Sequence, residues 1–187
     1  MTAYLETNLL PLVLSIEPKQ TESHILEALG LADRISPQSI LIAFGERIER
    51  FWNQVISDSK ADNLIEESNL LDVNGRQRQI DHLFKILDQV FYLESKCNLN
   101  FDSEKVRASN DKVNAIADTI GGNISAAYFV PVVATVSNSE QTKYANKGMN
   151  VWGVDDMLDH IDAPFTSAEY FTFLREVVAP ILEEKGL

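Results

Sequence analysis

Two carboxylates and a lysine come together if residues 78–96 form a β-hairpin. A two-residue loop at positions 87–88 sets Asp81 directly opposite Glu94. Side chains alternate between the two faces of a strand, so Lys96 lies on the same face as Glu94. Like charges opposite one another destabilise a sheet, and burial raises that cost, unless a cation lies between them. The spacing therefore predicts a cation site with a lysine beside it.

The ligand types favour a hard metal ion. Two carboxylates that leave room for water suit Mg²⁺ or Mn²⁺ rather than Zn²⁺. The histidines are scattered at His24, His82 and His160, and Cys97 is the single cysteine, so no zinc set is expected. His82 alternates to the face opposite Asp81 and is expected to be a structural residue.

A glutamate two residues before a lysine also occurs in solvated strands. Here Glu94 follows the apolar residues 90–93, which are typical of an interior strand. An unpaired charge is costly in such a strand, and this favours a functional site over a solvated ladder of charges.

The surrounding chain predicts an α/β domain with a mixed sheet covered by helices on both faces. Ser36-Pro37 is typical of a helix start, Asn74-Gly75 of a hairpin turn, and Gly121-Gly122 of a helix end. The residues predict helices over 4–16, 22–32, 36–57, 103–120 and 167–184, and strands over 64–73, 76–86, 89–98, 127–136 and 150–154. We expect a single domain over 1–187, with a helical extension (1–35), a core (36–136) and a C-terminal strand and helix (137–187).

Asp81, followed after twelve residues by Glu94-Ser95-Lys96, resembles the PD-(D/E)xK motif of the restriction-endonuclease-like nucleases. Ile80 stands where the family name has proline. The family core, a helix, three strands, a helix and a further strand, is similar to the order predicted for residues 36–136. Within the family, the chain looks most like a type II restriction endonuclease.

The resemblance implies a nuclease that hydrolyses phosphodiester bonds in double-stranded DNA at a specific sequence. Mg²⁺, with Mn²⁺ as a substitute, would be held by Asp81, Glu94 and the Ser95 carbonyl, with Glu49 (or Glu46 one turn earlier) also serving the metal. Lys96 would orient the attacking water and stabilise the developing negative charge. The resemblance also implies a homodimer.

Further residues could contact DNA. Asn98 and Asn100 continue the face of Glu94 and Lys96, and Cys97 between them is expected to be buried. The following helix carries residue types that bind phosphates and base edges, namely Lys105, Arg107, Ser109, Asn110 and Lys112. A solvated helix face explains these residues equally well. The polar segment 138–150 is expected to be a surface loop, with a second DNA contact as the alternative.

The overall charge weakens a nucleic-acid interpretation. The chain carries 16 Lys and Arg against 28 Asp and Glu, a net charge of −12, whereas DNA-binding proteins usually present a basic surface. Residues 76–112 are the least acidic part, with seven basic and six acidic side chains. Two alternatives stay open: a structure-selective repair or recombination nuclease of the same superfamily, and a non-catalytic acidic module that binds protein.

The length and the composition of the chain predict a cytoplasmic protein that does not associate with a membrane. The 187 residues suffice for a buried core, and one cysteine excludes a disulfide within the chain. The first residues lack the basic stretch of a signal peptide, and no apolar run is long enough to span a bilayer.

Overall fold

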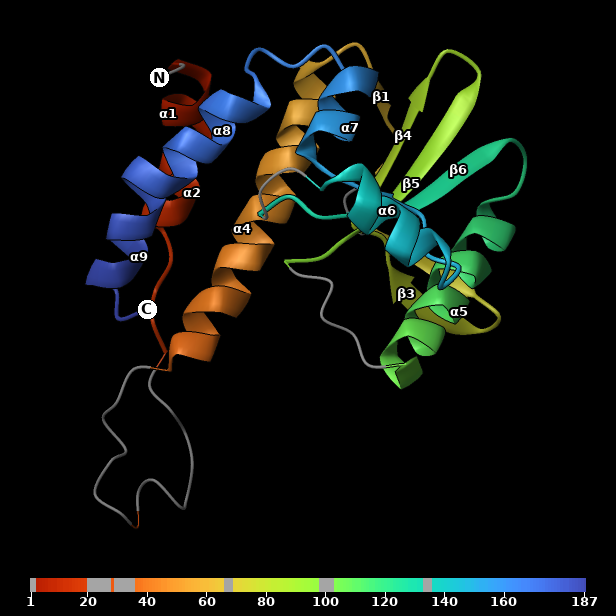
Figure 1. Cartoon of the computed structure of the whole chain (residues 1–187), viewed down its shortest axis with the longest axis horizontal. Helices are drawn as coiled ribbons and strands as arrows, with labels where there is room; N and C mark the ends of the chain where they lie inside the picture. The colour runs from red at the N-terminus through yellow and green to blue at the C-terminus, as the bar shows by residue number, and fades with distance from the viewer. Residues whose placement is uncertain (1–2, 20–27, 29–35, 66–68, 98–102, 133–135) are drawn as a thin grey trace. The chain divides into compact units, whose positions relative to one another are not determined.

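A computed structural model describes residues 3–19, 28, 36–65, 69–97, 103–132 and 136–187. The chain divides into two compact units, one formed by Met1–Phe51 with Ala168–Leu187 and the other by Trp52–Ser167. Figure 1 labels helices and strands of both units.

The first unit is helical. Ser36 precedes the long helix α4, and its hydroxyl accepts a hydrogen bond from the Ser39 N–H at 3.3 Å, which confirms the predicted helix start. Phe51 on α4 stacks on Tyr170 of α8 with ring centroids 6.2 Å apart. The predicted helix over 22–32 lies outside the described residues, apart from residue 28. The helices are α1 (Ala3–Asn8), α2 (Leu10–Leu14), α4 (Pro37–Asp58, which continues into the second unit), α8 (Ser167–Phe173), η1 (Leu174–Val178) and α9 (Ala179–Glu184).

The second unit contains a mixed five-stranded sheet, as predicted. Its strand order is β1-β4-β5-β6-β7, in which β1, β4 and β5 pair antiparallel and β5, β6 and β7 pair parallel. The strands are β1 (Asp62–Asn63), β4 (His82–Ile86), β5 (Gln89–Ser95), β6 (Ile124–Phe129) and β7 (Val151–Trp152).

Helices cover both faces of this sheet. On one face, Val113 and Ile116 of α5 (Ser103–Ile120) belong to the same buried cluster as Tyr92 and Tyr128. On the other face, the Trp52 ring meets the Phe129 ring edge-on at 5.1 Å. Neighbouring residues of a strand face opposite ways, so Tyr128 and Phe129 join the two halves of the core.

The segment 76–86, predicted to be one strand, forms two. Arg76–Gln79 is β3, which pairs with β2 (Leu70–Val73) in a separate two-stranded sheet. Ile80 is buried in the α5 cluster, and its N–H donates to the Asn69 carbonyl, so the chain leaves one sheet before entering the other. The predicted turn between β2 and β3 is confirmed, since Asn74 and Gly75 both have positive φ, 53° and 77°.

Three further expectations about elements were wrong in type or in extent. Residues 138–150 are not a loop throughout, because Ser137 and Glu140 form a capping box that starts helix α6 (Asn138–Ala145). The short strand predicted over 150–154 is present as β7 but is shorter than expected, because it ends at Trp152 and a second short helix, α7 (Val154–His160), begins at Val154. The strand predicted over 127–136 is β6, which ends at Phe129, before Pro131, a residue that cannot donate to a ladder.

Within the described residues, no helix is both long enough and apolar enough to cross a membrane.

Candidate functional site

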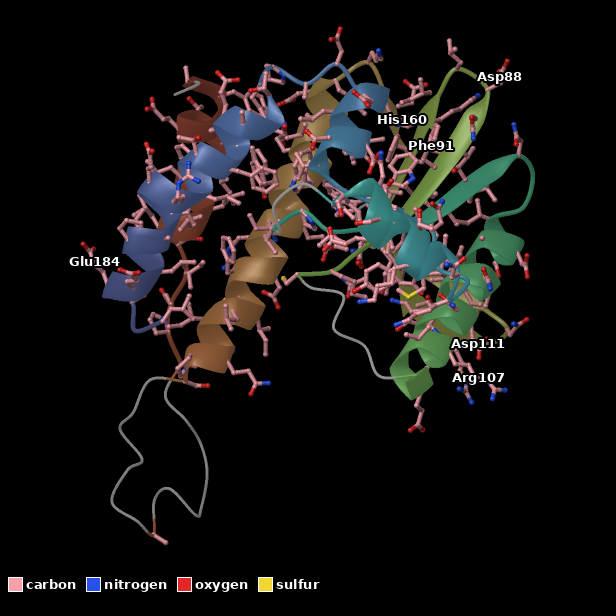
Figure 2. The ribbon with its side chains drawn as sticks, viewed as in Figure 1. Asp88, Phe91, Arg107, Asp111, His160 and Glu184 are labelled. Atoms are coloured by element: carbon pink, nitrogen blue, oxygen red, sulfur yellow. The ribbon has the colours of Figure 1, made fainter. Side chains whose placement is uncertain are left out.

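The β4–β5 hairpin has the register predicted from the sequence. Ile86 pairs with Gln89 and His82 with Leu93, around a loop whose tip carries Asp88 (Figure 2). Continuing this register by one residue sets Asp81, directly before β4, opposite Glu94. The backbone N–H of Ser95 donates to Oδ2 of Asp81 at 2.7 Å, which fixes the carboxylate beside the end of β5.

Glu94 is the centre of the site. Its side chain is buried, and its Oε1 accepts from the ammonium groups of Lys96 at 2.7 Å and Lys112 at 2.6 Å. Its second oxygen, Oε2, accepts from the Tyr92 hydroxyl at 2.8 Å. Three donors therefore converge on one buried carboxylate, and two of them carry a full positive charge.

The two carboxylates have opposite pKa shifts. Burial, followed by the negative charge of Glu94, raises the pKa of Asp81 to about 6, and Lys96 and Lys112 only partly oppose this. Burial also opposes ionisation of Glu94, but the two ammonium groups outweigh it and hold the pKa of Glu94 below its ordinary value. Near neutral pH, Glu94 is ionised, and Asp81 carries a charge that its surroundings disfavour.

A buried polar chain lies on the other face of the hairpin. Nδ1 of His82 is 2.9 Å from Oδ1 of Asn53, and Nε2 of His82 is 2.6 Å from the Ser95 hydroxyl. The amide of Asn53 also donates to the Asp81 carbonyl at 3.0 Å. His82 is thus a satisfied structural residue, as predicted, and its chain of hydrogen bonds joins α4 to the backbone on both sides of the site.

This order is similar to the Ser-His-Asp triad of enzymes with a nucleophilic serine, in which the histidine accepts the serine proton, but it has asparagine in the third position. His82 is fully buried, and burial lowers its pKa to about 3, far below the value suited to a general base near neutral pH. The chain therefore positions the backbone at Asp81 and Ser95 rather than carrying out chemistry itself.

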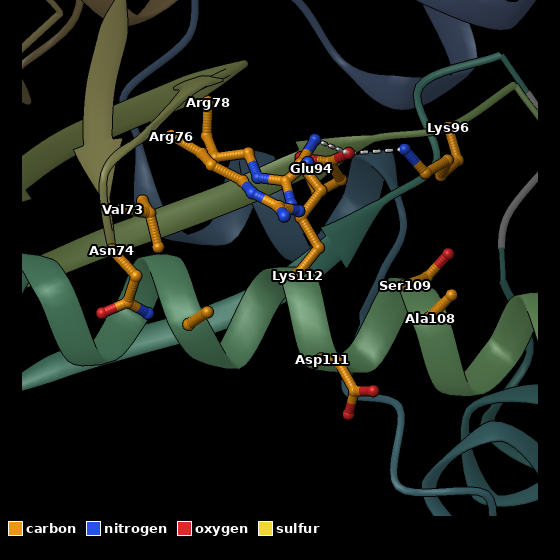
Figure 3. Close-up of a pocket in the computed structure, with 11 residues that line it drawn as sticks. Val73, Asn74, Arg76, Arg78, Glu94, Lys96, Ala108, Ser109, Asp111 and Lys112 are labelled. Carbon is orange, nitrogen blue, oxygen red and sulfur yellow. Dashed lines mark hydrogen bonds and ion pairs between the residues drawn. The ribbon is translucent and has the colours of Figure 1, made fainter.

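A cleft of about 860 Å³ opens beside Glu94, between the β2–β3 hairpin, the end of β5 and α5 (Figure 3). It does not include the Ser95–His82 pair. Its charged lining consists of four cationic side chains, Arg76, Arg78, Lys96 and Lys112, and two carboxylates, Glu94 and Asp111. The cleft is thus positively charged in a chain whose net charge is −12.

The residues predicted to contact DNA lie in different places and do not all line the cleft. Asn98 and Asn100 lie outside the described residues, as does the side chain of Lys105 on α5. Arg107 is exposed on α5 (Figure 2), whereas Ser109 and Lys112 line the cleft. Asn110 has internal partners, since it accepts from the Tyr128 hydroxyl at 3.1 Å and donates to the Lys147 carbonyl at 3.2 Å. Cys97, expected to be buried, is exposed because β5 ends at Ser95.

Asp81 and Glu94 are chemically suited to a divalent metal ion. Both are buried carboxylates, and the raised pKa of Asp81 reflects a pair that a cation would stabilise. Among the described residues, no three His, Cys, Asp or Glu side chains are grouped as a metal set. Mg²⁺ requires fewer protein ligands because it retains water, and the Ser95 carbonyl would be a third oxygen. Glu49 belongs to the other unit, and its service to the metal, like that of Glu46, stays a prediction.

Several residues next to Glu94 or in the cleft were not predicted from the sequence to belong to the site. Lys112 was assigned to DNA and was not paired with Glu94, and no role was given to Tyr92, Arg76 or Arg78. The arginines had one usable signal: they occupy alternate positions just after the Asn74-Gly75 turn and so share one face of the hairpin.

A comparison with protein-family models finds no match, and a search of curated protein sequences finds none.

Proposed function

We propose that this chain is a Mg²⁺-dependent endonuclease that hydrolyses phosphodiester bonds in double-stranded DNA. The observation that carries the proposal is the convergence of Lys96 and Lys112 on buried Glu94, opposite Asp81, at a positively charged cleft. Phosphodiester hydrolysis requires negative charge to be stabilised as it develops on the phosphate, and a cluster of partly buried cations suits that task.

The order of elements adds support. A helix (α4), antiparallel strands (β1, β4 and β5), a helix (α5) and a parallel strand (β6) follow one another, with the β2–β3 hairpin inserted. This order supports the restriction-endonuclease-like core that the sequence resemblance implies, and the spacing of Asp81, Glu94 and Lys96 supports the PD-(D/E)xK interpretation. The finer proposal is a type II restriction enzyme that acts as a homodimer on a two-fold sequence.

In the proposed mechanism, Asp81, Glu94 and the Ser95 carbonyl would hold the metal. The bound ion supplies a water of lowered pKa and withdraws charge from the scissile phosphate. Lys96 orients that water by hydrogen bonding and stabilises the negative charge that develops on the phosphate oxygens. The Ser95 N–H keeps Asp81 aimed at the site through the bond to Oδ2. Lys112, which donates to Oε1 of Glu94 at 2.6 Å, would become available to a phosphate oxygen if a metal ion took that oxygen.

One observation favours a second candidate, a non-catalytic module that binds protein. Glu94 is fully hydrogen-bonded by Tyr92, Lys96 and Lys112, so the group is stable as a structural ion cluster without a metal. The net charge of −12 suits a partner with a basic surface. This candidate predicts neither metal binding nor DNA cleavage at Glu94.

Cleavage of three DNA substrates by the full chain separates these functions. Phage DNA, a supercoiled plasmid and a branched junction are incubated with Mg²⁺ and, in parallel, with EDTA. Discrete fragments of phage DNA that require Mg²⁺ support a restriction enzyme, and preferential cutting of the junction supports a repair or recombination nuclease. The absence of cleavage on every substrate with either Mg²⁺ or Mn²⁺ would overturn the proposal and favour the protein-binding module.

A further inference from the structure

The β2–β3 hairpin places two arginines in the cleft beside the proposed active site. Arg76 and Arg78 are exposed and both line this cleft, with their side chains extending into it (Figure 3). They pair across the hairpin with Val73 and Leu71 respectively. Val73 is buried in the cluster under α5, and Leu71 packs against that cluster. This packing fixes the hairpin face from which the arginines project.

Neither guanidinium is neutralised within the described part of the chain. The salt bridges there include none to Arg76 or Arg78, whereas both lysines of the cleft share Glu94. The other carboxylate lining the cleft, Asp111, is exposed on α5. Both guanidinium groups thus face the cleft without a carboxylate partner among the described residues, although the chain has 28 acidic residues. They are therefore available for an anionic ligand.

The chemistry of that ligand follows from the donors. A guanidinium presents a planar fork of N–H groups that matches a phosphate, and it keeps its charge at any ordinary pH. Arg76 and Arg78 are two residues apart on one face of β3, so their Cα atoms lie roughly 7 Å from each other along the strand. A single small anion does not require two guanidinium groups at successive positions along a strand. A polymer with regularly repeated phosphates can bind one phosphate to each of them.

We propose that Arg76 and Arg78 bind consecutive backbone phosphates of a DNA strand and so lead it across Glu94 and Lys96. This inference rests on the proposed function and adds its substrate-positioning surface, which lies on β3 rather than on α5 alone. The contacts are to phosphate, so they fix the register of the strand without reading its sequence.

The test is the salt dependence of DNA binding by the full chain, measured in EDTA so that no cleavage occurs. Fluorescence anisotropy with a labelled duplex gives the association constant between about 50 and about 200 mM salt. Each phosphate contact contributes about 0.9 to the slope of log K against log salt. The Arg76→Gln/Arg78→Gln double variant is expected to bind more weakly, with a slope shallower by about 1.8.

Two controls isolate the effect. Arg76→Lys/Arg78→Lys keeps both charges and is expected to retain the wild-type slope. Lys60→Gln removes a charge from an exposed residue outside the lining of the cleft and is expected to change neither slope nor affinity. Circular dichroism of each variant verifies folding, which should persist because the arginines have no ion-pair partner among the described residues.

An unchanged slope and affinity in the double glutamine variant would overturn the inference, as would a wild-type chain that does not bind the duplex. The proposed function is tested separately by cleavage of DNA with Mg²⁺. Cleavage by wild type together with unaltered binding by the variant defeats only the arginine inference. Arginine-dependent binding without any cleavage defeats only the nuclease.

Discussion

The ammonium group of Lys112 lies 2.6 Å from Oε1 of Glu94, across eighteen positions of sequence. Lys96 reaches the same oxygen from two residues away. A helix and a strand therefore each supply one positive charge to a single buried oxygen. Under the proposed function, that oxygen is also a metal ligand, so Lys112 and the metal compete for it.

Replacing Lys112 by methionine is expected to tighten binding of a divalent cation by about tenfold, because one competing positive charge is removed. Methionine keeps much of the apolar stem that packs along α5. Isothermal titration of the chain with Mn²⁺, without DNA, measures the affinity directly.

The control for this prediction is Lys60→Met, which removes an exposed charge outside the cleft lining. It is expected to leave the Mn²⁺ affinity unchanged. Weaker or unaltered Mn²⁺ binding by Lys112→Met would show that Lys112 supports the site in some way other than by competing at Glu94.

Asp81→Asn is expected to stabilise the metal-free chain near neutral pH. The folded pKa of Asp81, about 6, lies above its ordinary value of 3.8, so only between these two pH values does the folded state hold a proton that the unfolded state has lost. Stability from this group is therefore present below the ordinary value and is lost as pH rises through about 6. Asparagine carries no charge and can still accept the Ser95 N–H, so the gain should be on the order of 2 kcal/mol above pH 6.

Urea unfolding in EDTA between about pH 4 and about pH 8 measures this difference. The stabilisation by Asp81→Asn should shrink as the pH falls toward 4. A variant that is less stable than wild type at pH 7, or a difference that is independent of pH, would contradict the account of Asp81.

Ser95→Ala is expected to lower the free energy of unfolding by about 1 to 3 kcal/mol, because it leaves Nε2 of buried His82 without its partner. Cys97→Ser is the matched control, since Cys97 is exposed two residues along and its replacement should be nearly neutral. Denaturant unfolding of both variants at neutral pH compares them. Equal stability of Ser95→Ala and wild type would mean that water or another group satisfies His82.

The sequence was most informative where local rules act alone. The loop at Leu87 and Asp88 fixed the register of β4 and β5, because hairpin pairing follows from loop length. The C-terminal limit of α5 followed from Gly121 and Gly122, both of which have positive φ.

Other features depended on tertiary structure and escaped the sequence analysis. No glycine or proline interrupts residues 76–86, so no strong local signal indicates that β3 and β4 belong to different sheets. Helix α6 has no buried residue and thus no apolar stripe to reveal it. The contact between Lys112 and Glu94 depends on how α5 is rotated against the sheet, which sequence spacing does not specify.

The most direct test of the central claim is the single-turnover rate of DNA cleavage by Lys96→Ala. If Asp81, Glu94 and Lys96 form the active site, the wild-type chain is expected to cleave DNA in the presence of Mg²⁺ and not in the presence of EDTA. Lys96→Ala is also expected to lose about 100-fold or more in rate, while Lys60→Ala stays within about twofold of wild type. Cleavage by folded Lys96→Ala at the wild-type rate, or cleavage by wild type that persists in EDTA, would contradict the account.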